Sequence, residues 1–265
     1  MQYVYAIVPA SATGLPAGPG IDGREIEPIR LDTVAALASA VRTERVRPSR
    51  ANLSAHQGVV SEAHGRSPVL PVRFGTVMRD RRSVREELLE PGRPRFERML
   101  AEFEGKDEFR LKGRYLPEVA LREVVEGSGI IARLRERVRA AGRSARPGDQ
   151  IRLGELVAAG LERLCQRDAA AVLGALSPHV AAWESINVIR QSESHLGRID
   201  AGTRMISRSS DDVPFYAALL VERVRVPDLD ATLEKIAADQ RGRMELELVG
   251  PLPPWDFSAV SAGAA

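Results

Sequence analysis

Apolar and polar positions follow two periods along the chain, and together they predict a mixture of strands and helices. Short apolar or alternating runs are typical of β-strands, whereas apolar residues spaced by three and four are typical of helices. Runs of the first kind are Tyr3–Val8, Ile26–Arg30, Pro68–Asp80, Phe109–Tyr115, Trp183–Arg190, Pro214–Val224 and Met244–Val249. Helical spacing follows Ser49 and Pro227 and occurs in Val84–Leu89, Pro94–Gly105, Val119–Val125, Ile130–Ala140 and Ile151–Leu173. The alanine-rich stretch Val34–Val41 fits either a strand or a short helix.

The stretch Pro68–Asp80 is largely apolar and rich in β-branched residues. It predicts a single strand that is covered on both faces. Pro71 has no N–H to donate, which favours an edge or bulged position in the sheet. Gly75 permits a bend, and either Asp80 or Ser83 is expected to begin the next helix.

Arg73 is the one charged residue in the middle of this apolar stretch. A buried guanidinium needs acceptors for its N–H donors. Arg73 is therefore expected either to join loops together or to face a cleft, and the structural role is favoured.

The order of the predicted elements divides the chain into two α+β domains. Residues 1–106 form the first, residues 107–257 form the second, and the polar break Gly105–Glu108 lies at the boundary. The second domain has the order strand, helix, strand, strand, helix, strand, which is the ferredoxin-like (βαββαβ) pattern, here with inserted helices. Helices are expected on one face of its sheet, so the other face is solvated or docked. Residues 258–265 are expected to fray.

Segments rich in glycine, proline or polar residues lie between and after these elements. Gly142–Asp149 is predicted to be a flexible loop, and Gln191–Asp212 a long excursion or an irregular hairpin. The final stretch Gly250–Phe257 is stiffened by prolines and carries the aromatic residues Trp255 and Phe257. These side chains are expected to pack back on the sheet or across the domain junction.

Composition places the chain among ordinary globular proteins. The 38 basic and 36 acidic residues leave a net charge of +2, and no block of like charge stands out, so nucleic acid is not an expected partner. No apolar run approaches the ~20 residues of a membrane-spanning helix, so no membrane is expected either. Cys165 is the only cysteine. It excludes an internal disulfide, suits a reducing cytoplasm and is expected to be a buried, inert thiol.

Motifs for catalysis or cofactor binding are missing from the sequence. It contains neither a phosphate-binding glycine loop nor a zinc motif, so no cofactor and no metal is expected. His56 shares a helical face with Leu53 and Val60, which favours a hydrogen-bonded core histidine over a ligand or a base. His195 lies near Glu193 in a turn-rich stretch, where a catalytic role is the less favoured interpretation. An enzyme is therefore the weaker hypothesis.

Four motifs occur in order along nearly the whole chain. They are Y-V-Y-A-I-V-P from Tyr3, N-L-S-A-H-Q-G-V-V from Asn52, V-L-P-V-R-F-G-T-V from Val69 and G-P-L-P-P-W-D-F from Gly250. Together they resemble the GvpF/GvpL family of gas vesicle proteins. The L-P-V-R-F-G-T-V and G-P-L-P-P-W-D-F segments are the more specific part of this resemblance.

The resemblance implies a non-catalytic, two-domain accessory or minor structural protein of the gas vesicle, with a ferredoxin-like C-terminal domain. Its implied partners are the main shell protein, GvpA, and possible further accessory proteins, and its implied location is the cytoplasm and the gas vesicle. No catalytic residues are carried over. The motif positions are candidates for partner binding or for the domain junction: Arg73, Phe74, Gly75, Pro253, Pro254, Trp255 and Phe257.

An adaptor of this kind could cover the apolar surface and free strand edges of an unassembled shell protein. Two routes are open, strand addition at a sheet edge or docking of an amphipathic helix in a groove between the domains. The alternative hypothesis is a small-molecule-binding or enzymatic ferredoxin-like domain that uses the His195 loop.

Overall fold

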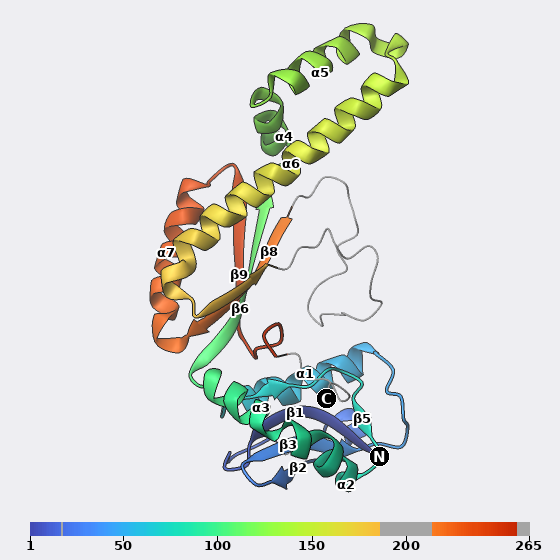
Figure 1. Cartoon of the computed structure of the whole chain (residues 1–265), viewed down its shortest axis with the longest axis vertical. Coiled ribbons are helices and arrows are strands. Elements are labelled where there is room, and N and C mark those ends of the chain that lie inside the picture. The colour runs from blue at the N-terminus through green and yellow to red at the C-terminus, as the bar shows by residue number, and fades with distance from the viewer. Residues whose placement is uncertain (17, 186–213, 259–265) are drawn as a thin grey trace.

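The computed structural model describes residues 1–16, 18–185 and 214–258. Within them, two β-sheets lie one after the other along the long axis of the molecule, and each sheet packs against its own helices (Figure 1). The mixture of helices and strands expected from the sequence is confirmed. No helix within the described ranges is long and apolar enough to cross a membrane.

The first sheet is built around β1 (Gln2–Pro9), whose neighbours on both sides run antiparallel to it. The strand order is β2–β3–β1–β4, and β5 also pairs with β1. The partner strands are β2 (Ile26–Leu31), β3 (Val34–Ala40), β4 (Leu70–Pro71) and β5 (Val77–Met78). The alanine-rich stretch is therefore a strand, because its small side chains lie buried between two neighbouring strands.

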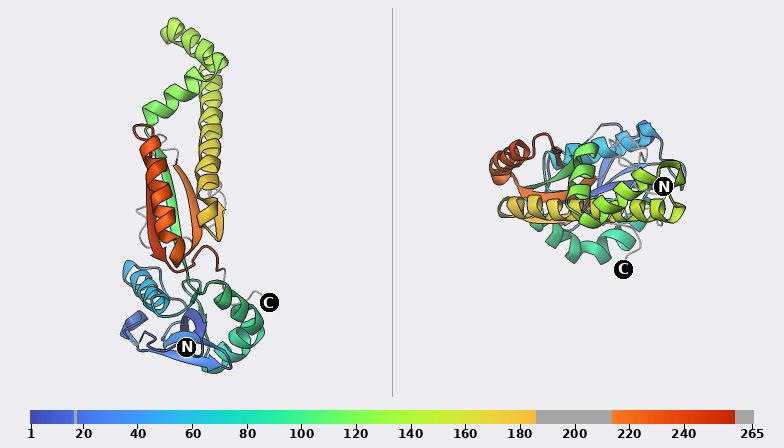
Figure 2. Two further views of the ribbon diagram at one scale, coloured as in Figure 1. Left: turned by 90° about the vertical axis from the view of Figure 1, so that its left-hand side faces the viewer. Right: turned by 90° about the horizontal axis from the view of Figure 1, so that it is seen from above.

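Helices cover both faces of this sheet (Figure 2). Tyr3 packs with Val60 of α1 (Arg50–His64) on one face, whereas Val4 packs with Leu100 of α3 (Glu90–Glu102) on the other. Burial on both sides explains why β1 is apolar at nearly every position instead of alternating.

The predicted single strand over Pro68–Asp80 is wrong, because a turn divides it. The two short strands β4 and β5 both pair with β1, and the Thr76 N–H donates to the carbonyl oxygen of Arg73 between them. Gly75 has a φ of 88°, a conformation that favours glycine. The expected edge position of Pro71 is confirmed, but the turn places Arg73 in solvent, so its predicted burial is wrong.

Helix starts follow the predicted capping residues in two places. Ser49 caps α1, and Asp80 accepts a hydrogen bond from the Ser83 N–H at the start of α2 (Arg81–Ser83). From there a π-helical segment, η2 (Val84–Leu89), runs directly into α3, so the predicted new helix at Pro94 is wrong. A proline inside a helix removes one backbone hydrogen bond and crowds the preceding turn, which together cost about 3 kcal/mol. Each large apolar side chain that the helix buries on the sheet stabilises the fold by roughly 1.5–3 kcal/mol, which offsets the cost of the proline.

The second sheet has the strand order β7–β8–β6–β9, with every neighbouring pair antiparallel. The strands are β6 (Lys106–Tyr115), β7 (Ala182–Ser185), β8 (Pro214–Glu222) and β9 (Met244–Leu252). One face packs against α7 (Val226–Asp239) and the C-terminal half of α6 (Pro147–Leu176). Strand β6 begins inside the stretch that the sequence predicts to be a polar break. The end of the predicted strand over Trp183–Arg190 and the excursion with Glu193 and His195 lie outside the described residues.

A helical arm extends beyond the end of this sheet (Figures 1 and 2). It consists of α4 (Pro117–Glu126), α5 (Gly129–Ala141) and the first half of α6. The flexible loop predicted over Gly142–Asp149 is instead mostly ordered. A 3-10 turn, η3 (Gly142–Ser144), occupies its first part, and α6 begins at Pro147, where the missing N–H costs nothing.

The face of the second sheet opposite the helices is charged, as the alternation in β6 predicts. Arg114 of β6 forms an ion pair of 2.9 Å with Glu245 of β9. Glu108 departs from the expected charged outer face because it is fully buried. Trp183, the first residue of the predicted strand Trp183–Arg190, lies on β7 and is 47% exposed.

Candidate functional site

The two most specific motifs, one in the R-F-G turn and one in the C-terminal tail, meet around His56. His56 comes from α1 and is buried. Its ring lies 5.6 Å from the Phe74 ring and 5.7 Å from the Trp255 ring, centre to centre. Tyr3 and Tyr5 of β1 complete this aromatic cluster. Residues from the first strand, the first helix, the R-F-G turn and the C-terminal tail thus form one packed group.

Burial keeps the titratable side chains of this cluster neutral. The Tyr3 hydroxyl accepts from the Gly75 N–H at 3.0 Å and lies 3.0 Å from Nδ1 of His56. A neutral imidazole can either accept the hydroxyl proton at Nδ1 or donate an Nδ1 proton to the hydroxyl oxygen. Burial lowers the pKa of His56 to about 4, and burial raises the pKa of Tyr3. Both groups are neutral at physiological pH, as the predicted core histidine requires.

Strand β9 includes the first residues of the tail, and beyond Leu252 the tail folds as a compact turn. Pro253 and Pro254 are buried, and the Ser258 hydroxyl donates to the Pro254 carbonyl at 2.6 Å. Trp255 packs with the His56 cluster, whereas Phe257 packs against the core on the other face of the first sheet. A Cβ at Gly250 would lie 2.4 Å from the Phe109 ring, so only glycine fits there. The tail therefore contacts both sheets.

A buried carboxyl holds the tail in place. Glu108 of β6 accepts from the Asp256 N–H at 2.7 Å and from Nε of Arg110 at 3.1 Å, and the same Nε lies 3.1 Å from the Asp256 carboxylate. Burial and the neighbouring Asp256 carboxylate raise the pKa of Glu108 to about 8. The Glu108 proton and the Arg110 charge together offset the two carboxyls, which keeps this buried group close to neutral.

A second polar group joins α1 to the second sheet. Nε2 of His64, at the end of α1, lies 2.8 Å from Oδ1 of Asp107 in β6. Arg223, after β8, donates to both oxygens of the same carboxylate at 3.0 and 3.2 Å. Burial lowers the pKa of His64, an effect opposed by Asp107. This contact connects the two sheets directly.

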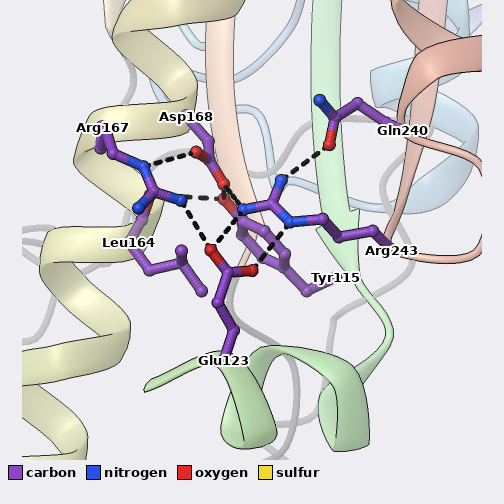
Figure 3. Close-up of polar contacts among 7 residues, drawn as sticks. All are labelled: Tyr115, Glu123, Leu164, Arg167, Asp168, Gln240 and Arg243. Atoms are coloured by element: carbon purple, nitrogen blue, oxygen red, sulfur yellow. Dashed lines mark hydrogen bonds and ion pairs between the residues drawn. The ribbon is translucent and has the colours of Figure 1, made fainter. Parts of the chain in front are cut away.

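A third polar group lies at the base of the helical arm (Figure 3). Arg243, just before β9, donates to Glu123 of α4 at 2.8 Å and to Asp168 of α6. The Tyr115 hydroxyl donates to Asp168 at 2.6 Å, and Arg167 bridges Asp168 and Glu123. The hydrogen bond from Arg243 lowers the pKa of Glu123. The group therefore fixes α4 and α6 against the end of the sheet.

In each of these three groups the charged side chains form ion pairs with one another. None of the three groups places a nucleophile beside a base. Cys165 is buried, and burial raises the pKa of its thiol. Among the described residues, no group of three or more side chains could hold a metal ion. The hollow beside Asp168 is shallow, at about 170 Å³. The described geometry therefore favours a structural role for these residues.

Sequence reasoning located some of these residues and missed others. The structure brings Phe74 and Trp255 together, places Pro253, Pro254 and Phe257 in the same tail turn, and gives Gly75 a hydrogen bond to Tyr3. Arg73 stays outside this group. The ion-pair residues were missed: His64, Asp107, Glu108, Arg223 and Asp256. Their one sequence signal is the adjacent acidic pair at positions 107 and 108, which resembles a polar linker.

Comparisons with known proteins agree over the whole chain. The family described as "Gas vesicle synthesis protein GvpL/GvpF" matches residues 1–259. The chain is 31% identical over 257 residues to gas vesicle protein F of Streptomyces sp. (strain CB03234), covering 96% of this chain and 98% of that protein. It is 27% identical over 281 residues to gas vesicle protein L of the same organism, covering 98% and 94%.

Solved structures show the same fold. The crystal structure of GvpF from Anabaena sp. PCC7120 has a TM-score of 0.73 and 19% identity, covering 98% of this chain and 96% of that chain. GvpF from Microcystis aeruginosa has a TM-score of 0.71 and 22% identity, covering 98% and 99%. At these identities the similarity establishes the fold alone.

Proposed function

Since the chain belongs to the GvpL/GvpF family of gas vesicle synthesis proteins, we propose that it is a non-catalytic adaptor that binds the shell protein GvpA during assembly. Family membership supports the gas-vesicle role. The binding of GvpA and the adaptor activity are the proposal. We place the protein in the cytoplasm and at the growing vesicle.

We further propose that residues 107–257 form a ferredoxin-like domain. In chain order the strands β6, β7, β8 and β9 are numbered one to four, and their spatial order is two, three, one, four, with all neighbours antiparallel. Such an order with helices on one face supports a split βαβ arrangement. The long crossover from β6 to β7 contains the arm, which accounts for the inserted helices.

The candidate motif residues serve the junction in this proposal. Phe74, Gly75, Trp255 and Phe257, with the prolines at 253 and 254, hold the first sheet and the tail together. The His64–Asp107–Arg223 group adds a direct link. A rigid pair of sheets gives a partner a fixed binding surface and lowers the entropy cost of binding. Arg73 and Gly75 are exposed on the turn, so the Arg73 side chain remains available to a partner.

The observation that carries the proposal is that each sheet ends on a strand paired on one side only. Within the described residues, β2 pairs with β3 alone and β9 pairs with β6 alone. A free edge can accept a strand from a partner. The unpaired N–H and C=O groups of that strand would otherwise promote aggregation of the partner. Strand addition is therefore our preferred route, and GvpA is the proposed source of the strand.

Photocrosslinking tests this proposal directly. A photoreactive phenylalanine derivative replaces Arg30 on β2 or Glu247 on β9, both of which are exposed, and the matched control carries it at the exposed Glu162 of α6. Crosslinks to purified GvpA from an edge position but not from Glu162 would support strand addition. GvpA binding with crosslinks from neither edge would contradict the route, and lack of any binding would contradict the function.

A further inference from the structure

The end of the helical arm carries a local excess of positive charge that the near-neutral total conceals. We define the basic tip as residues 129–152, which contain α5, η3 and the start of α6. Its seven arginines face only two acidic residues, Glu136 and Asp149. The arginines are Arg133, Arg135, Arg137, Arg139, Arg143, Arg146 and Arg152. Since the whole chain has a net charge of +2, the remaining residues are net negative.

Most of this charge is not neutralised within the tip, which the structure describes completely. Arg139 pairs with Glu136 at 2.9 Å and Arg137 lies 3.8 Å from Asp149. These two ion pairs are exposed, so each contributes at most about 1 kcal/mol. The other five arginines form no further ion pair among the described residues, and all seven are exposed.

The packing of α5 limits which partners this surface fits. Ile131 and Leu134 of α5 are buried toward α6, which leaves Ile130 and Ile151 as the large exposed apolar residues of the tip. Two such residues are less than the continuous apolar face that a lipid-binding helix needs. The tip contains no aromatic residue on which a nucleic-acid base could stack. Arg133 and Arg137 are four residues apart and therefore lie on one side of the helix. A helix with acidic residues at the same spacing is the matching surface.

Such a helix occurs in the chain itself. On α7, Leu229 and Leu233 are buried against the sheet, while Asp230 and Glu234 are exposed and four residues apart. Neither carboxylate has an ion-pair partner among the described residues. The helix carries four acidic residues and a single lysine, Lys235.

The tip cannot reach α7 of its own chain. Helix α7 lies along the sheet, whereas the tip extends away beyond the sheet's end, and the views from two directions agree on this (Figures 1 and 2). We propose that the basic tip of one copy docks on the acidic side of α7 of a second copy. The two surfaces differ, so the contact is head-to-tail and can repeat to form short open chains.

This inference does not depend on the proposed function and is tested with the purified full chain alone. Light scattering measures the molar mass over a concentration series at about 50 mM and about 500 mM salt. The mass should rise above 28.9 kDa with concentration at low salt and return to that of the monomer at high salt, because exposed charges are screened.

Charge reversal makes the test specific. Arg133→Glu with Arg137→Glu should weaken self-association at least tenfold, and so should Asp230→Arg with Glu234→Arg. Mixing the two double variants should restore association, since each reversed surface then meets its complement. Arg42→Glu with Arg45→Glu, on an exposed loop of the first domain, is the matched control and should leave association unchanged.

Three results would overturn the inference: monomer mass at all concentrations in low salt, self-association insensitive to reversal of the tip, or a mixture that stays monomeric. Circular dichroism of each variant separates loss of docking from loss of fold. If the tip variant unfolds, Arg133→Gln with Arg137→Gln replaces it. If the α7 variant unfolds, Asp230→Asn with Glu234→Gln replaces it. The same outcomes apply to these neutral variants, with a smaller change in association.

Discussion

The rings of His56 and Trp255 lie 5.7 Å apart, centre to centre, although they come from the first helix and from the C-terminal tail. This contact brings the C-terminal tail back to the first helix. It places the tail against the first sheet, while the Asp256 N–H binds Glu108 of the second sheet. The stability of the whole molecule should therefore depend on the tail.

Replacing Trp255 with alanine tests this dependence. The side chain is half-buried in the aromatic cluster, so its removal should lower the free energy of unfolding by about 2 kcal/mol. The matched control is Trp183→Ala, at an exposed tryptophan on β7, which should cost less than about 1 kcal/mol. Denaturant unfolding measures both. A W255A variant as stable as the original chain would mean that the tail does not stabilise the fold.

Asp107 should matter more than any exposed ion pair. Asp107→Asn removes the charge that faces both His64 and Arg223, and we expect a loss of about 2 kcal/mol, reduced because Arg223 is half exposed. Glu245→Gln breaks the exposed pair with Arg114 and should change stability by no more than about 0.5 kcal/mol. Thermal unfolding of the two variants compares them. A D107N variant as stable as E245Q would show that the contact between the sheets is energetically neutral.

The lowered pKa of His56 gives a pH dependence of known sign. Between about pH 6.5 and about pH 4 the unfolded chain binds a proton at this residue that the folded chain does not bind, so stability falls as the pH falls. The full effect is roughly 3 kcal/mol. Glu108 has the opposite sign, since its raised pKa gives stability that is lost as the pH rises toward about 8.

The variant His56→Gln isolates this effect, because glutamine offers Tyr3 an acceptor and does not titrate. The unfolding free energy of the original chain minus that of H56Q should fall by up to about 3 kcal/mol from pH 7 to pH 4. Taking this difference cancels the contributions of Glu108 and His64. A difference that stays constant over this range would contradict a neutral, buried His56.

Arg243 should hold the arm to the sheet. Arg243→Gln removes the cation that joins Glu123 and Asp168 to the end of the sheet and leaves them with Arg167 of α6 as their shared cation, so the pKa of Glu123 should rise toward its usual range. Backbone hydrogen exchange in α4 should speed up at least tenfold. Arg152→Gln, at an exposed arginine of the tip, is the control and should leave exchange in α4 unchanged. Unchanged exchange in R243Q would show that the arm is fixed by apolar packing alone.

The sequence predicts those elements whose period is set by burial. Strand β1 is apolar throughout because helices cover both faces, and the capping side chains of Ser49 and Asp80 mark true helix starts. The prediction of elements from the sequence is wrong where one residue changes the direction of the chain or where packing overrides a local signal. Gly75 turns the chain and splits one predicted strand in two, and continuous packing carries a helix past Pro94. The predicted domain boundary near residue 106 stays a prediction.

The candidate site is predicted only in part, because its motifs are local and its ion pairs are not. Phe74 and Trp255 belong to recognisable motifs, so their importance is visible in the sequence. His64 and Asp107 are brought together by the packing of α1 near β6, and no spacing in the sequence indicates that contact. The basic tip shows the same limit, since a near-neutral total hides opposite charges on separate elements.

Our central proposal is that this chain binds GvpA during assembly and thereby keeps it from aggregating. The most direct measurement is light scattering of purified GvpA diluted from denaturant, with and without an equimolar amount of the chain. We expect scattering to be suppressed and a soluble complex of both proteins to be recovered. Undiminished aggregation, with the chain remaining free in solution, would contradict the claim.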